Sequence, residues 1–193
     1  FSLRNEVAVY GGFAGTESAL NERDPLKNPT MLCGDFDMND EIINEHGEFL
    51  HFEQNWENAY HVVRITDDDG VVGPETILDG FTITRGNANG SSDDNDKGGG
   101  ILVTGQSNPT LRNLEIISNQ ARQDGGGVYY RNDKPGSEPG ALTACLIGGN
   151  KGGRGGGVFV HQGSASAPLR LVNLTVAGNQ AEVGGGVFVG SEN

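Results

Sequence analysis

The sequence has few of the residues that mark several common classes of protein. Its two cysteines, Cys33 and Cys145, match no metal-binding spacing and form no disulfide framework. We expect both to be small, buried apolar side chains, and a disulfide between them is the less favoured alternative. Lysine and arginine number only 13 against 26 acidic residues, which gives a formal charge of −13. Nucleic acid is excluded as a partner, because a phosphate-binding surface needs a basic stripe.

Long hydrophobic runs are missing as well. No apolar segment approaches the roughly 20 residues that a membrane-spanning helix needs, which argues against membrane insertion of this segment. Apolar residues make up only 35% of the 193, a low share for a compact core. We therefore expect one elongated domain over residues 1–193.

Glycine, in contrast, is abundant, with 32 copies. It lacks the strict three-residue period of collagen. Four glycine triplets instead precede "ILV", "VYY", "VFV" and "VFV", and they begin 27 to 30 residues apart at Gly98, Gly125, Gly155 and Gly184. A period of about 29 residues indicates stacked supersecondary units that bury their apolar faces against one another.

A second motif lies between the triplets. The stretches "PTLRNLEIISNQA", "ALTACLIGGNK" and "PLRLVNLTVAGNQA" place Asn119, Asn150 and Asn179 in register. Their β-branched residues and two-residue alternation predict short strands rather than helices. The alternation slips by one residue at Asn113 and Asn173, which we interpret as corners, because asparagine tolerates left-handed backbone conformations.

The fold predicted is all-β: a right-handed parallel β-helix of about six coils, each with three short strands. Stacking would bring Asn119, Asn150 and Asn179 into a ladder of hydrogen-bonded amides. The leading glycines of the triplets would open the next corner, where φ is positive or two backbones approach closely. Residues 98–193 form the regular coils of this prediction. Residues 1–97 form irregular coils with long loops at 35–58 and 67–97.

The motifs also carry a family resemblance. The "GGG(I/V)" triplets and the "I-x-x-N" and "V-x-x-N" endings resemble the GGA(I/L) and FxxN repeats of polymorphic outer-membrane proteins. The stretches "VAVYGGFAGTE", "NPTMLCGD", "NAYHVV" and "TILDGFTITRGNA" are similar, in that order, to the opening of bacterial secreted right-handed β-helix proteins. The resemblance implies an extracellular or cell-surface location and a structural or adhesive role. It implies no catalytic residues.

Enzymes also occur on such a scaffold, so a polysaccharide lyase or hydrolase, or a glycan-binding module, is the alternative function. A hydrolase needs two clustered carboxylates. The predicted strands offer only Glu115 as an outward acid. We therefore expect no catalytic residues and a stiff spacer or binding scaffold.

One loop carries a partial metal-binding pattern. Asp35, Asp37 and Asn39 stand at alternate positions, like the start of a D-x-D-x-N calcium loop. Asp40 then replaces the glycine of an EF-hand, and His46 replaces its bidentate glutamate. An EF-hand is thus excluded. A looser Ca²⁺ site and a merely solvated acidic loop both remain open.

The same region contains an aromatic cluster of Phe49, Phe52, Trp56 and Tyr60. These side chains either form a platform for sugar or, as we favour, anchor the 35–58 insertion against the first coils.

The last coil opens with "GGGVFVGSEN", and a coil left without a cap would expose unpaired backbone groups. We therefore expect the 193 residues to be a segment of a longer chain, or a protomer that associates end to end. Further coils, a second copy, and surface glycans or matrix are the expected partners.

Overall fold

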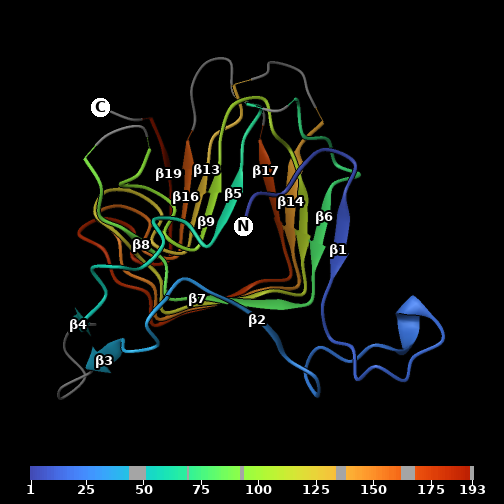
Figure 1. The fold of residues 1–193 in the computed structure, drawn as a ribbon. Coiled ribbons are helices and arrows are strands. Elements are labelled where there is room, and N and C mark those ends of the chain that lie inside the picture. The colour runs from blue at the N-terminus through green and yellow to red at the C-terminus, as the bar shows by residue number, and fades with distance from the viewer. Residues whose placement is uncertain (44–50, 69, 92–93, 134–137, 162–167, 192–193) are drawn as a thin grey trace.

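The computed structural model is a parallel β-solenoid (Figure 1). It describes residues 1–43, 51–68, 70–91, 94–133, 138–161 and 168–191. Figure 1 shows three sheets as walls around a common interior, with the β3–β4 hairpin and the 11–29 segment outside them. Apart from the 3₁₀ turn η1 (Leu20–Glu22), every regular element in these residues is a strand.

Each wall is a five-stranded parallel sheet. Sheet I contains β1 (Ala8–Tyr10), β6 (Ile77–Asp79), β10 (Thr110–Arg112), β14 (Gly140–Thr143) and β17 (Leu169–Val172). Sheet II contains β2 (Thr30–Cys33), β7 (Phe81–Thr84), β11 (Glu115–Ile117), β15 (Leu146–Gly148) and β18 (Thr175–Ala177). Sheet III contains β5 (Val63–Ile65), β9 (Ile101–Val103), β13 (Val128–Tyr130), β16 (Val158–His161) and β19 (Val187–Gly190).

Two smaller sheets complete the fold. The parallel pair β8 (Asn87–Ala88) and β12 (Gln120–Ala121) lies between sheets II and III in the chain. The antiparallel pair β3 (Glu41–Ile43) and β4 (His51–Glu53) belongs to the predicted 35–58 loop.

In the described residues the solenoid has five coils, one fewer than predicted, because each main sheet contains five strands. The regular stack also starts earlier than expected. Residues 67–97 are not one long loop, since β6, β7 and β8 lie within them. The stretch "TILDGFTITRGNA" thus supplies the sheet I and sheet II strands of a regular coil, in which Asp79-Gly80 takes the place of the later corner asparagine.

The core consists of apolar side chains stacked from coil to coil. Leu78, Leu111 and Leu142 occupy equivalent positions in sheet I, and Ile83, Ile116 and Ile147 do so in sheet II. All six side chains are at most 2% exposed and belong to one apolar cluster. Each coil covers the apolar side chains of its neighbours, and a single coil could not bury its apolar face alone.

The corners between sheets I and II have left-handed backbone. Asn113 and Asn173 have φ angles of 52° and 54°, as their sequence pattern predicted. The equivalent residues are Gly80, with φ of 83°, and Ala144, with φ of 53°. The corner therefore needs the conformation rather than the asparagine side chain, although asparagine adopts it more readily than alanine does.

A second apolar column lies on the outer side of sheet III. Tyr129 and Phe159 stack at 5.3 Å between ring centroids, and Phe159 and Phe188 at 5.4 Å. Tyr129 and Phe159 are fully buried. The Arg154 guanidinium lies 5.1 Å from the Phe159 ring, and a bidentate ion pair with Asp124 holds it there. Strands β9, β13 and β16 are consequently buried on both faces, whereas the sequence suggested half-buried strands.

Both cysteines are free, as expected. Cys145 is buried, and this burial raises the pKa of its thiol to about 11. It is therefore an unreactive core side chain. Cys33 was also expected to be buried, but it is only half-buried at the end of β2.

Candidate functional site

The asparagine ladder is the feature that the repeat dictates most directly. The Asn119 side-chain amide donates to Oδ1 of Asn150 at 3.0 Å, and the Asn150 amide donates to Oδ1 of Asn179 at 2.9 Å. Each Oδ1 also accepts from the backbone N–H of the preceding ladder residue, at 3.0 Å in both cases. Asn119 and Asn150 are fully buried. The predicted residues thus meet in one continuous hydrogen-bonded stack.

The ladder side chains also form hydrogen bonds with the backbone of the sheet II strands that precede them. The second amide hydrogen of Asn150 goes to the carbonyl of Ile116, and that of Asn179 goes to the carbonyl of Ile147. In the coil before Asn119 the ladder position is Gly86, whose N–H donates to Oδ1 of Asn119 at 2.9 Å. A glycine can therefore begin the ladder, because only its backbone donor is needed.

The leading glycines of the four triplets form the next corner. Gly98, Gly125, Gly155 and Gly184 have φ angles of 60°, 63°, 60° and 64°. This repeated left-handed conformation is what the sequence pattern predicted for these positions. The second glycine of the first three triplets has a different role, because there the backbones of successive coils approach closely.

We expect Gly126→Ala to destabilise the fold by about 1–3 kcal/mol through overpacking. A Cβ atom at Gly126 would run into the Lys151 carbonyl oxygen and lie 2.7 Å from that of Gly156. The matched control is Gly148→Ala, whose Cβ would come no closer than 3.4 Å to the Ala177 carbonyl oxygen. Urea unfolding of both variants should show a clear loss only for Gly126→Ala, and equal midpoints would contradict the close approach.

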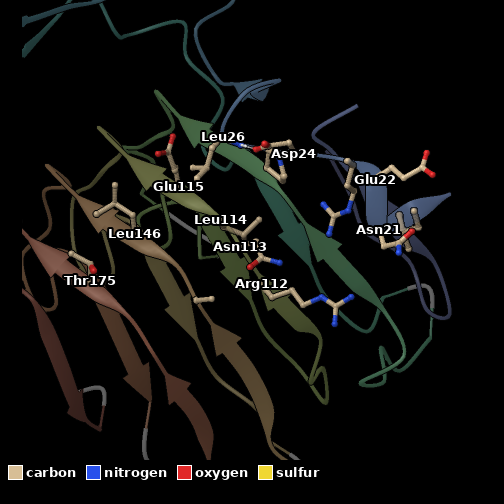
Figure 2. A pocket seen from close by; sticks show the side chains of 14 residues that line it. Asn21, Glu22, Asp24, Leu26, Arg112, Asn113, Leu114, Glu115, Leu146 and Thr175 are labelled. Atoms are coloured by element: carbon tan, nitrogen blue, oxygen red, sulfur yellow. Dashed lines mark hydrogen bonds between the residues drawn. The ribbon is translucent and has the colours of Figure 1, made fainter. Parts of the chain in front are cut away.

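A groove runs along the outer face of sheet II, beside the 20–26 segment (Figure 2). Its volume is about 1080 Å³. Glu115, Leu146 and Thr175 form a row on successive strands along its floor, because they are paired in register. Arg112 and Asn113 lie beside this row, and Leu26 extends over it from the opposite wall with 87% of its surface exposed.

Asp79 is the buried anchor of this groove. Its carboxylate lies 2.6 Å from Nη2 of Arg23, accepts from Nε of Arg112 at 2.7 Å and accepts from the Asn113 amide at 2.8 Å. The Asp79 side chain is fully buried. Burial raises the pKa of Asp79, but the hydrogen bonds from Arg23, Asn113 and Arg112 outweigh it and hold the pKa below its ordinary value. Arg23 and Arg112, which both line the groove, are thus held in place by one shared carboxylate.

The groove holds Glu115, the one outward strand acid that the sequence offered. Its Oε2 accepts from the Thr82 hydroxyl at 3.1 Å. Glu22 and Asp24 line the groove from the opposite segment. The groove therefore presents charged groups of both signs, the acids beside Arg23 and Arg112, together with hydrogen-bonding groups for a polar ligand.

The predicted calcium residues are only partly brought together. Asp35 is buried, with 4% exposure, and its carboxylate accepts backbone N–H bonds from Asn39 at 3.2 Å and Asp40 at 3.1 Å. Burial raises the pKa of Asp35, but these backbone bonds, with the nearby Arg85 charge, lower it below the ordinary value. Asp37 is exposed and lies apart from the described carboxylate cluster.

The carboxylates that do cluster with Asp35 are Asp40 and Glu57. Sequence reasoning counted Asp40 as a departure from the calcium pattern and did not consider Glu57. Local spacing along residues 35–40 could not indicate Glu57, because the fold brings the two ends of the insertion together.

The aromatic cluster does not anchor the insertion in the way favoured from the sequence. Trp56 is 78% exposed and Tyr60 is 44% exposed. Phe52 is half-buried, and Phe49 lies outside the described residues. Phe36 and Met38, at 69% and 78%, add further exposed apolar surface to the insertion.

Comparisons with known proteins add no relative. Neither the protein-family models nor the curated proteins nor the solved structures include a match to this chain. In the described residues we find no helix with the length and apolar character needed to cross a bilayer.

Proposed function

We propose that this chain is a structural module, a stiff solenoid that serves as a spacer or binding scaffold outside the cell or at a bacterial cell surface. The observation that carries this proposal is the hydrogen-bonded ladder of Asn119, Asn150 and Asn179, of which the first two are fully buried. It joins three successive coils by side-chain hydrogen bonds in addition to the strand pairing, so bending between these coils would break buried polar contacts.

The outer aromatic column supports the same role. Tyr129, Phe159 and Phe188 stack across the same three coils on the outer side of sheet III. The module is therefore braced by one polar column and one aromatic column. Such bracing suits a protein whose task is to keep a shape.

Adhesion is the second candidate, and the exposed apolar residues of the insertion favour it. Trp56 and Tyr60 present large aromatic surface to solvent on a segment that protrudes from the solenoid. Exposed aromatic rings are suited to packing against the apolar faces of sugar rings.

Catalysis by the carboxylate cluster is disfavoured by its burial. Oδ1 of Asp40 and both carboxylate oxygens of Glu57 are shielded from solvent. An acid or base that acts on a polysaccharide must come within hydrogen-bonding distance of its glycosidic bond. These oxygens could reach a chain only after the insertion had moved.

A glycan array combined with a release assay on acidic polysaccharides tests these alternatives. We expect no release of oligosaccharides, and release by the wild-type chain would overturn the structural proposal. If the array shows binding, Trp56→Ala should abolish it without changing the melting temperature, because the Trp56 side chain is mostly exposed.

Labelling intact cells of the source organism with an antibody tests the location. We expect the antibody to reach the module at the cell surface or in the medium. Protein found only inside the cell would contradict the proposed role.

A further inference from the structure

Three carboxylates from the two ends of the insertion meet beside the solenoid. Asp35 and Asp40 follow β2, and Glu57 precedes β5. One oxygen from each of the three lies within 4.8 Å of the others. Carboxylates so close together repel one another unless a proton or a cation lies among them.

The buried oxygens of this cluster lack hydrogen-bond donors. Oδ1 of Asp40, both Oε atoms of Glu57 and the side-chain oxygens of Asn39 and Asn58 are shielded from solvent, with no partner among the described residues. The Asp40 side chain is only 2% exposed, and Asn58 is 8% exposed. Buried acceptors are normally paired, so the unpaired oxygens of Asp40, Glu57 and Asn58 beside the clustered carboxylates call for a ligand that accepts electron pairs.

Asn58 belongs to this cluster by direct contact. Its amide nitrogen donates to Oδ2 of Asp40 at 2.7 Å and to the carbonyl of Arg85 at 2.8 Å. These bonds use the donor end of the amide, and Oδ1 is left without a donor. A neutral amide oxygen beside a carboxylate is a typical ligand of a hard cation.

The protein itself neutralises only part of the charge. Nη1 of Arg85 lies 3.1 Å from Oδ2 of Asp35 and 3.8 Å from Oδ2 of Asp40. It also donates to the Asp40 carbonyl at 3.0 Å. One guanidinium thus contacts two of the three carboxylates, and among the described residues Glu57 has no ion pair with a cation. Burial, with the charges of Asp35 and Glu57, raises the pKa of Asp40 despite the Asn58 bond and Arg85.

We propose that Asp40, Glu57 and Asn58, with Asp35 at the edge, form a binding site for one divalent cation of the Ca²⁺ class. The donors are all oxygens, both charged and neutral, which suits Ca²⁺ better than the nitrogen and sulfur ligands that favour Zn²⁺. The cation would balance the remaining charge and pair the orphaned oxygens. It would also join the two ends of the insertion to each other and to Arg85 at the end of β7.

This ligand set differs from the calcium pattern read from the sequence. Asp37 is exposed and is not a ligand in it. Asp37 therefore provides a matched control, since it carries the same charge in the same segment.

Calorimetry and thermal unfolding of the 193-residue chain, treated with chelator and then titrated with CaCl₂, test the proposal. We expect one Ca²⁺ per chain and a rise in melting temperature of about 5 °C or more at about a hundredfold excess over Kd. Glu57→Gln should weaken Ca²⁺ binding at least about tenfold. Asp37→Asn should leave it unchanged.

A second measurement separates a metal site from a purely structural cluster. Without Ca²⁺, Glu57→Gln should melt at the same or a higher temperature than wild type, because it removes a buried, unpaired charge. The proposal fails if the wild type shows neither heat nor a thermal shift with millimolar Ca²⁺. It also fails if Asp37→Asn abolishes binding, or if Glu57→Gln binds Ca²⁺ like the wild type.

Discussion

Asp79→Ala is expected to destabilise the solenoid by about 3–5 kcal/mol, the range found when one partner of a buried ion pair is removed. The Asp79 carboxylate has no exposed surface and contacts two arginines. Removing it leaves Arg23, only 12% exposed, without its counter-charge. It also frees the 20–26 segment from the wall that carries Arg112, so the groove should lose its shape.

The matched control is Asp68→Ala. Asp68 also pairs with an arginine, Arg64, at 2.7 Å, but its side chain is 62% exposed. Exposed ion pairs contribute little, so we expect less than about 1 kcal/mol. Chemical denaturation should separate the two variants clearly. Similar losses would mean that the buried pairing at Asp79 does not stabilise the fold.

The lowered pKa of Asp79 predicts a pH dependence of known sign. In the unfolded chain an aspartate has a pKa of about 3.9. A group whose pKa is lower in the folded state contributes stability that is fully present above the unfolded value and is lost as the pH falls through the folded value. The wild type should therefore lose stability on acidification below about pH 4. Asp79→Asn should lose less over the same interval, as measured by the free energy of unfolding.

The repeated part of this fold could be predicted because the same constraint recurs in every coil. Asn119, Asn150 and Asn179 are visible in the sequence, since each must occupy the same corner. The same is true of the leading glycines of the triplets, whose positive φ is needed wherever the chain turns. A pattern present several times can be read without knowledge of distant contacts.

The parts that were missed depend on pairings that occur once. Asp79 meets Arg23, which lies 56 residues earlier, and nothing in the local sequence of either residue indicates the other. Asp40 and Glu57 likewise meet only because the solenoid brings the two ends of the insertion together. The outer aromatic column was missed for a different reason. Alternation indicates which residues face inward, but it does not reveal that Arg154 covers the outward rings.

The ladder leads to the second large expected effect. Asn150→Leu should destabilise the fold by about 3 kcal/mol, since each buried donor or acceptor left unpaired costs about 1–3 kcal/mol. Oδ1 of Asn150 accepts from both the backbone and the side-chain nitrogen of Asn119. Leucine removes that acceptor, so the buried backbone N–H of Asn119 loses its hydrogen-bond partner. The bulkier leucine side chain would also crowd Gly127. There is little space between the two residues, since a Cβ atom added to Gly127 would lie 3.0 Å from the Asn150 amide nitrogen.

Asn89→Leu is the control for this substitution, because Asn89 is exposed and lies outside the ladder. The same chemical change there should alter the free energy of unfolding by less than about 0.5 kcal/mol. A further variant, Asn150→Asp, keeps Oδ1 but replaces the donor that serves Ile116 and Asn179 with a second acceptor. Its carboxylate would face two oxygens in a buried place, so the loss of stability of Asn150→Asp relative to wild type should be larger at pH 7 than at a pH low enough to protonate it. Equal stability of Asn150→Leu and Asn89→Leu, or an Asn150→Asp variant as stable as wild type at neutral pH, would show that the stacked amides do not hold the coils together.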